Sequence, residues 1–263
     1  MTDTQHQPSA TSAPRRERAR SGLYALWFGV LAPATLLGVL AAMALSALPS
    51  VALLREAARW SEGWPLLGRV VLFAALVGPC YFAFAALACV FGSLVARPLR
   101  RGVVEGSHPI YSLQTTWWGM YGLVMGIVHL TLLPRMNPLA SVWIRLMGGK
   151  CGKRLVCLNP AGFSDLALLD IGDDVVIGSG AVIICHSVTR DTFRLAPVKI
   201  ERGASIGTYT VILQGVTVGA RAVVAPNSTV EPGTTIPSGE TWGGVPAVCI
   251  RKARERALRE VGQ

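Results

Sequence analysis

A single histidine, His186, stands where a regular repeat in the sequence is interrupted. The interruption separates Ile183 from Ile200 by 17 positions and carries polar and charged residues among its aliphatic ones. A neutral imidazole accepts a proton from a hydroxyl or an amine, and histidine is the most frequent general base of enzymes. Loops that leave a rigid scaffold often carry catalytic residues. We therefore predict that His186 is a general base; the alternative is a loop histidine with a purely structural role.

Asp191 and Arg194 lie in the same interruption and are further candidates for the site. A carboxylate beside an imidazole fixes the orientation of the ring, so Asp191 is predicted to orient His186 during catalysis. The alternative for Asp191 is a solvated loop acid. The planar guanidinium of an arginine binds anions, so Arg194 is predicted to bind an anionic substrate group, or else to tie the loop down.

The residues on both sides of the interruption repeat with a period of six. An aliphatic residue takes every sixth place in two runs: Ile171, Ile177 and Ile183, and then Ile200, Ile206, Ile212, Val218, Val224, Val230 and Ile236. A period of six matches neither a helix nor an ordinary strand. It is typical of a chain wound into a three-sided coil, with one aliphatic side chain pointing inward from each side. The sequence therefore predicts an all-β coil of parallel strands over residues 150–249.

The first part of the chain has the composition of a membrane segment. Charged residues make up only 15% of the chain, against about 25% in soluble domains. Residues 23–48 and 70–96 form two runs of 26 and 27 residues without a charge, and about 20 apolar residues suffice to span a bilayer. We predict a transmembrane helical hairpin over residues 23–101. The alternative, two buried helices of a soluble protein, is disfavoured because the runs have no polar face.

The basic residues around the two runs predict their orientation. Four arginines precede the first run, and Arg97, Arg100 and Arg101 follow the second. The positive-inside rule then places both ends of the chain and the coil in the cytoplasm, although the connector also carries arginines. The expected location is the inner (plasma) membrane, as a multi-pass protein. Residues 1–22 are polar and basic and are expected to be disordered.

Two further segments flank the coil. Residues 102–149 contain a 17-residue uncharged stretch with Trp117, Trp118 and Tyr121. Aromatic residues favour the membrane interface, so we predict a helix lying there; the alternative is a third span, which would place the coil outside the cell. Residues 250–263 are rich in Arg, Glu and Ala and are predicted to form a short helix that covers the open end of the coil.

Several motifs along the coil follow a fixed order. The order is repeat, histidine, arginine-bearing loop, Pro-Val-x-Ile, repeats and Gly-x-Pro-Ala, and it is carried here by His186, Arg194, Pro197–Ile200 and Gly244–Ala247. On these motifs, residues 171–251 resemble hexapeptide-repeat acyltransferases of the left-handed β-helix type, in the pattern of maltose and galactoside acetyltransferases.

A second likeness covers about residues 106–247 and rests on Trp143–Gly149, Gly239–Glu240 and Trp242–Ala247. These motifs resemble the membrane-bound C-terminal region of poly-lysine-synthetase-type peptide synthetases. No adenylation or carrier domain is read from these residues, so a synthetase activity is not expected.

The resemblance implies a left-handed parallel β-helix that forms a homotrimer, with acyl-CoA in grooves between neighbouring coils. It implies that His186 is the general base, that Arg194 and Trp242 bind substrate, and that Gly207, Thr208 and Ser228 bind the co-substrate. The expected co-substrate is acetyl-CoA or another acyl thioester. One residue departs from the family pattern: Pro226 has no N–H to donate to the pantetheine, so an acyl-carrier protein is an alternative donor.

The sequence as a whole predicts a membrane-anchored acyltransferase, O- or N-acetyltransferase-like, that acts on a hydroxyl or an amine of a membrane-associated or polymeric acceptor. The alternative is a non-catalytic trimeric scaffold in a biosynthetic complex at the membrane. Zinc-dependent hydration is disfavoured because it requires three coil histidines and this coil has only His186. No metal and no nucleic acid are expected. A channel is also disfavoured, because the spans contain no ionisable residue.

Overall fold

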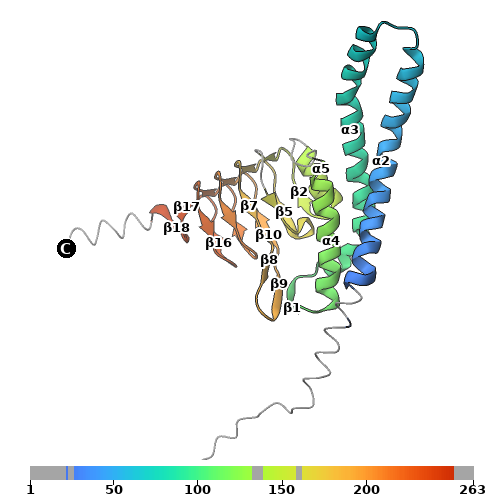
Figure 1. Ribbon diagram of the computed structural model, residues 1–263. Coiled ribbons are helices and arrows are strands. Elements are labelled where there is room, and N and C mark those ends of the chain that lie inside the picture. The colour runs from blue at the N-terminus through green and yellow to red at the C-terminus, as the bar shows by residue number, and fades with distance from the viewer. Residues whose placement is uncertain (1–21, 23–26, 132–138, 158–161, 252–263) are drawn as a thin grey trace, which may run out of the picture.

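The computed structural model describes residues 22, 27–131, 139–157 and 162–251. A long helical hairpin comes first, two shorter helices follow, and a coil of short strands extends away from them (Figure 1). The predicted disordered segment 1–22 lies outside the described residues except for Gly22, and only Ile250 and Arg251 of the predicted terminal helix are described.

The hairpin consists of α2 (Ala32–Trp60), preceded by the π-helical turn η1 (Trp27–Leu31), and α3 (Leu66–Leu99). Two helical stretches, Gly29–Trp60 and Leu66–Gly102, are long and apolar enough to cross a membrane. In the most apolar 18-residue segment of each stretch, only 17% (first stretch) and 11% (second stretch) is buried within the chain. The hairpin therefore presents a largely apolar outer surface. The two predicted apolar helices are therefore present, and both are longer than the uncharged runs.

Helix α4 (Leu113–His129) packs along the second half of α3 and runs antiparallel to it. Two glycines, one in α3 and one in the turn that follows it, allow α4 to approach closely. A Cβ at Gly92 would lie 2.5 Å from Val128 Cγ2, and one at Gly102, in the turn η2 (Arg100–Gly102), would lie 2.0 Å from Trp117 Cβ. A helix antiparallel to α3 does not lie in the plane of a bilayer that α3 crosses. An in-plane position of α4 is therefore incompatible with a membrane-spanning α3, and both the spanning helix and the interfacial helix stay predictions.

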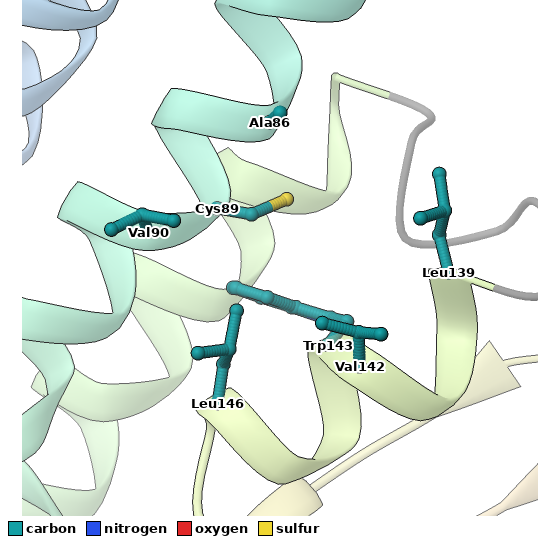
Figure 2. A pocket seen from close by; sticks show the side chains of 7 residues that line it. All are labelled: Ala86, Cys89, Val90, Leu139, Val142, Trp143 and Leu146. Carbon is teal, nitrogen blue, oxygen red and sulfur yellow. The ribbon is translucent and has the colours of Figure 1, made fainter.

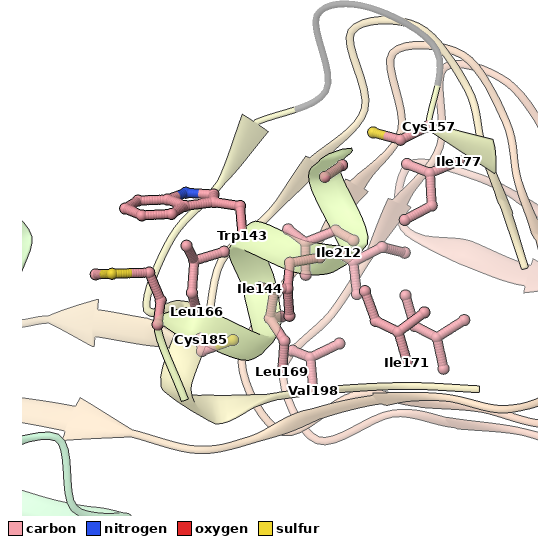
Figure 3. Packing of buried hydrophobic residues seen from close by; sticks show 14 of the residues in the cluster. Trp143, Ile144, Cys157, Leu166, Leu169, Ile171, Ile177, Cys185, Val198 and Ile212 are labelled. Carbon is pink, nitrogen blue, oxygen red and sulfur yellow. The ribbon is translucent and has the colours of Figure 1, made fainter. Parts of the chain in front are cut away.

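The shorter helix α5 (Leu139–Leu146) lies between the hairpin and the coil. On one side it faces α3 across a small apolar cavity (Figure 2). On the other side Trp143 and Ile144 pack over Leu166 and Leu169 at the first end of the coil (Figure 3). One contiguous core thus extends from the hairpin through α4 and α5 into the coil.

The coil has three sides, each a sheet of parallel strands, as predicted for residues 150–249. The first side contains β2 (Lys150–Cys151), β5 (Leu169–Ile171), β10 (Val198–Ile200), β13 (Thr217–Val218) and β16 (Thr235–Ile236). The second contains β3 (Val156–Cys157), β6 (Val176–Ile177), β11 (Ser205–Ile206), β14 (Val223–Val224) and β17 (Thr241–Gly244). The third contains β4 (Gly162–Phe163), β7 (Val182–Ile183), β12 (Val211–Ile212) and β15 (Thr229–Val230).

The register confirms the period of six. Ile200 pairs with Val218, and Val218 pairs with Ile236, so one regular turn of the coil takes 18 residues, or three repeats. The inward aliphatic residue of every side is at most 2% exposed. The strand β18 (Ala247–Cys249) pairs antiparallel with β17 and ends the described coil.

Cysteines occupy several buried positions of the coil. Cys151 and Cys157 stack beneath Ile171 and Ile177, and all six cysteines of the chain are free thiols. Burial raises the pKa of the Cys157 thiol to about 11 and also raises the pKa of Cys185. These thiols remain protonated near neutral pH and act as small apolar residues.

Two insertions break the 18-residue turn, and both fall at the same corner of the coil. Phe163 and Ile171 are eight positions apart instead of six, and Ile183 and Ile200 are 17 apart. Phe163 lies directly beneath Ile183 in the third side. The two insertions therefore leave the coil on consecutive turns, one above the other.

The inward aliphatic side chains are predicted to carry the stability of the coil. Ile183 is fully buried, whereas its neighbour Val182 points outward and is 37% exposed. Ile183→Ala should lower the free energy of unfolding by about 2–5 kcal/mol, because it leaves a cavity. The matched change Val182→Ala should cost less than about 1 kcal/mol. Thermal unfolding of the detergent-solubilised chain, followed by circular dichroism, tests this; equal losses would contradict the inward packing.

Candidate functional site

The longer insertion forms a β-hairpin at the corner of the coil. Strand β8 (His186–Val188) pairs antiparallel with β9 (Thr192–Leu195), and β1 (Gly106–Pro109) adds to the outer edge of β9. His186 lies opposite Leu195 at the base of the hairpin. Because the side chains of a strand alternate between faces, His186 shares one face with the buried Phe193 and Leu195.

The shorter insertion places Asp165 beneath His186. Asp165 Oδ2 lies 2.6 Å from His186 Nδ1, and the Asp165 side chain is only 3% exposed. Its backbone adopts the left-handed conformation with φ of 53°, which aspartate tolerates better than most residues. A 3₁₀ turn, η4 (Leu166–Leu168), follows at once, and Leu168 N donates to Asp165 O at 2.7 Å. The turn fixes the carboxylate at the corner.

Two more donors hold the same carboxylate. Trp118 Nε1 donates to Asp165 Oδ1 at 2.5 Å, and Ser164 Oγ donates to Oδ2 at 2.9 Å. A carboxylate only accepts hydrogen bonds, so the proton between Asp165 and His186 belongs on Nδ1 of the imidazole. The other ring nitrogen, Nε2, then carries a lone pair and is able to accept a proton.

The reactive nitrogen is accessible. The His186 side chain is 26% exposed. Among the described residues Nε2 has no hydrogen-bond partner, and it is not one of the polar atoms sealed away from solvent. The ring is packed edge-on against Trp118, at 5.0 Å between centroids, with Phe193 at 6.0 Å. The arrangement therefore combines a fixed ring, a defined tautomer and an open nitrogen, which is the geometry of a general base.

Helix α4 supplies a second polar contact to this corner. One turn after Trp118, Tyr121 OH donates to Met147 O and accepts from Ala167 N, both at 3.1 Å. Tyr121 is fully buried, and this burial raises the pKa of its phenol. Trp118 and Tyr121 together fasten the corner of the coil to α4.

Asp191 lies elsewhere. It falls in the turn of the β8–β9 hairpin, its side chain is exposed, and its carbonyl accepts from Ile110 N at 3.2 Å. The register puts it at the opposite end of the hairpin from His186. The expectation that Asp191 orients the imidazole is therefore corrected: the structure gives the His186 Nδ1 contact to Asp165. The eight-position spacing from Phe163 to Ile171 was the sequence signal for Asp165, whereas no local signal marked Trp118.

Arg194 is exposed and lies between the buried Phe193 and Leu195. Its side chain therefore points to the opposite face of the hairpin from His186. The structure does not bring Arg194 to the imidazole of its own chain.

The residues expected to bind the co-substrate form corners of later coil turns. A Cβ at Gly207 would lie 2.4 Å from Pro226 N, so the stacking of turns requires glycine there. Thr208 O accepts from Asn227 N at 2.9 Å. The buried Ser228 accepts from Gly244 N at 3.1 Å through its Oγ. These contacts stabilise the coil, and none of them reaches His186.

Trp242 occupies an inward position in the last described turn. It lies in register with Val224, packs against the core, and donates from Nε1 to Glu240 Oε2 at 2.8 Å. The described residues contain no group of three or more His, Cys, Asp or Glu side chains placed to hold a metal ion.

The comparison with known protein families agrees with the period-six repeat of the coil. A family model described as "Bacterial transferase hexapeptide (six repeats)" matches residues 197–232, which confirms the predicted resemblance to hexapeptide-repeat transferases. Delta-poly-L-ornithine synthetase of Acinetobacter baumannii (strain AB307-0294) is 26% identical over 168 residues, which are 64% of this chain and 12% of that protein. This match agrees with the second likeness read from the sequence.

Other proteins that are similar to this chain are named as a carbonic anhydrase and an acetyltransferase. The mitochondrial gamma carbonic anhydrase 2 of Arabidopsis thaliana is 39% identical over 93 residues, 35% of this chain and 29% of that protein. The chain thus spans less than a third of the length of these curated relatives. A crystal structure of a hexapeptide-repeat acetyltransferase of Vibrio cholerae O1 biovar eltor, complexed with acetyl coenzyme A, is 34% identical, with 40% of this chain and 60% of that chain covered and a TM-score of 0.37.

The tautomer of His186 is predicted to depend on Asp165. In Asp165→Asn, the amide oxygen still accepts from Trp118, but the amide NH₂ faces Nδ1 and drives the ring proton to Nε2. ¹⁵N NMR of histidine-labelled protein should show the Nδ1–H form in the parent chain and the Nε2–H form in the variant. Asp170→Asn, which changes a nearby coil carboxylate, serves as the control and should leave the signal unchanged. The Nδ1–H form in both variants would contradict the assigned hydrogen bond.

Proposed function

We propose that this chain is a membrane-anchored acyltransferase in which His186 is the general base and Asp165 orients it. The observation that carries the proposal is the hydrogen-bonded pair itself: a buried carboxylate holds Nδ1 and leaves Nε2 open. The pair lies at the corner of a hexapeptide-repeat coil, and the matching family model is described as one of bacterial transferases.

The proposed reaction transfers an acyl group from a thioester to a hydroxyl or an amine. Nε2 of His186 accepts the proton of the acceptor as its oxygen or nitrogen attacks the thioester carbonyl carbon. Asp165 stabilises the imidazolium that forms, through the bond to Nδ1. Backbone N–H groups at a coil corner stabilise the oxyanion. The C–S bond then breaks, and the imidazolium returns its proton to the leaving thiolate.

The donor and its binding groove follow the family resemblance. We propose acetyl-CoA or another acyl thioester as donor, bound in a groove between left-handed coils of a homotrimer, with Gly207, Thr208 and Ser228 along that groove. Pro226 is exposed and offers no N–H, which supports an acyl-carrier protein as the alternative donor. Arg194 faces away from His186 of its own chain, so we propose it as a substrate contact only toward a neighbouring subunit. Trp242 packs inward in the last described turn, so we do not propose it as a direct substrate contact.

The membrane part of the proposal rests on the apolar surface of α2 and α3. The hairpin spans the inner membrane, with the coil on the cytoplasmic side. Anchoring raises the effective concentration of an acceptor that is itself bound to the membrane. We therefore propose a membrane-associated or polymeric acceptor that presents a hydroxyl or an amine.

A non-catalytic trimeric scaffold is the second candidate. The observation that favours it is that Pro226 removes a donor from the place where the family pattern supplies backbone N–H groups. A scaffold has no need for an open Nε2 on a fixed imidazole, so turnover separates the two candidates.

Removal of the base is predicted to abolish acyl transfer. In proteoliposomes that contain membrane lipid extract, the full chain should release free thiol from acetyl-CoA. His186→Ala should lower this rate by on the order of 10²–10⁴-fold, and Asp165→Asn should also lower it strongly, because the wrong tautomer is present. Asp191→Asn is the control and should leave the rate unchanged. Unchanged turnover in His186→Ala would remove the catalytic assignment, and no turnover of the parent chain with acyl-CoA or acyl-carrier protein would favour the scaffold.

The proposed topology predicts which side of the membrane each loop faces. A cysteine introduced at Gly63, in the connector between α2 and α3, should react with a membrane-impermeant maleimide from outside the cell, because the hairpin tip is external. A cysteine introduced at Gln263 should react only after the cells are opened. Reaction of the Gln263 position in intact cells would overturn the cytoplasmic placement of the coil.

A further inference from the structure

The two oxygens of the Asp165 carboxylate have different partners. Oδ2 accepts from His186 Nδ1 at 2.6 Å and from Ser164 Oγ at 2.9 Å. Oδ1 accepts from Trp118 Nε1 at 2.5 Å, and within the described residues no other group donates to it. Because the Asp165 side chain is buried, Oδ1 would be an unpaired buried acceptor without the indole N–H.

The indole of Trp118 is held in place from both sides. Its ring centroid lies 5.0 Å from that of His186 and 4.4 Å from that of Phe193. Tyr121 is three positions further along α4 and therefore lies on the same face of the helix. Its hydroxyl accepts from Ala167 N, which belongs to the same corner of the coil as Asp165. These contacts fix the indole N–H on Oδ1.

A donor to Oδ1 also changes how strongly Oδ2 binds the imidazole. The two oxygens of a carboxylate share one negative charge, so a hydrogen bond to one oxygen draws charge away from the other. Without the Trp118 N–H, Oδ2 carries more charge and binds Nδ1–H more strongly, which favours the imidazolium form of His186. In the imidazolium Nε2 is protonated and accepts no further proton. The Trp118 N–H therefore favours the neutral ring.

We propose that Trp118 is a positioning residue that acts on His186 through Asp165 and keeps Nε2 available as a base. The inference rests on the proposed function, because it presupposes that His186 is the general base. It adds α4 to the site: the base of the coil depends on a helix that packs along α3. Trp118 itself touches the imidazole and the carboxylate, and takes no part in the proton transfer.

Other groups that can be charged lie on the elements around the imidazole. They are the thiol of Cys185, the phenol of Tyr121 on α4, the imidazole of His108 on β1 and the guanidinium of Arg194 on β9. Burial raises the pKa of Cys185 and of Tyr121, so both are neutral near neutral pH. In the described part of the chain none of the four side chains bonds to His186 or Asp165, and Trp118→Phe leaves all four unchanged.

The contact is tested first by NMR of the full chain in detergent, with ¹⁵N-labelled tryptophan and histidine. A hydrogen bond to a carboxylate should place the indole proton of Trp118 downfield of that of Trp117, and Asp165→Asn should move it upfield. Trp118→Phe keeps an aromatic ring and removes the N–H, so the Nδ1 proton of His186 should move downfield. Trp117→Phe, the same change one residue away, is the matched control and should leave this proton unchanged. An unchanged Nδ1 proton in Trp118→Phe would overturn the inference.

The effect on the base is tested by the pH dependence of thiol release. In Trp118→Phe the acid limb of the profile should move to higher pH by about half to one unit, because the imidazolium is favoured. The rate on the plateau should fall less than about tenfold, because the base itself is retained. In the Asp165→Asn chain, the further change Trp118→Phe should not move the limb of the residual rate. A uniformly lower rate with an unmoved limb would make Trp118 purely structural and would overturn the inference.

The two measurements separate this inference from the proposed function, because the NMR signals do not require turnover. Full turnover in His186→Ala would overturn the general base, even where the Nδ1 proton moves in Trp118→Phe and shows the contact through Asp165. Loss of turnover in His186→Ala together with an unmoved acid limb in Trp118→Phe would overturn the role of Trp118 alone.

Discussion

The carboxylate of Asp165 is the group on which the arrangement of the site depends. A buried charge is costly unless donors surround it, and three donors from three parts of the chain do so here: Trp118 of α4, Ser164 of the coil corner and His186 of the hairpin. The same contacts that satisfy the charge also fix the imidazole and fasten α4 to the coil. The electrostatic requirement of one buried group thus determines the relative positions of the three elements.

The sequence predicted the coil because its period is a property of neighbouring residues. Every sixth side chain, from Ile200 to Ile236, points inward, so a local pattern was enough to predict the parallel strands and the insertion that carries His186. The residues that contact His186 could not be predicted from its sequence neighbours. Asp165 comes from the preceding turn and Trp118 from a separate helix, and both reach the imidazole only once the coil is wound. Asp191 is nearer in sequence, but the antiparallel hairpin carries it to the far end.

The aromatic residues of α4 have partners within the chain that composition alone does not reveal. Trp117, Trp118 and Tyr121 suggested a helix lying at the surface of a bilayer, where such side chains are common. In the structure they have intramolecular partners instead: Trp117 packs on Gly102, Trp118 bonds to Asp165, and Tyr121 bonds to Met147 and Ala167. These amphipathic side chains lie where α4 packs against other parts of the same chain. The same residue types are common where a protein meets the surface of a bilayer, so the sequence pattern does not distinguish the two environments.

The antiparallel packing of α4 on α3 also works as a spacer. His129, at one end of α4, is next to the part of α3 that approaches the bilayer in the proposed orientation, and Trp118, at the other end, touches His186. The two residues are eleven positions apart, which corresponds to about 16 Å of rigid helix. In the proposed orientation the imidazole then stands at a set height above the membrane. The acceptor proposed for it would present its hydroxyl or amine at that height, so the length of the segment between lipid and reactive group would become a selection criterion in its own right.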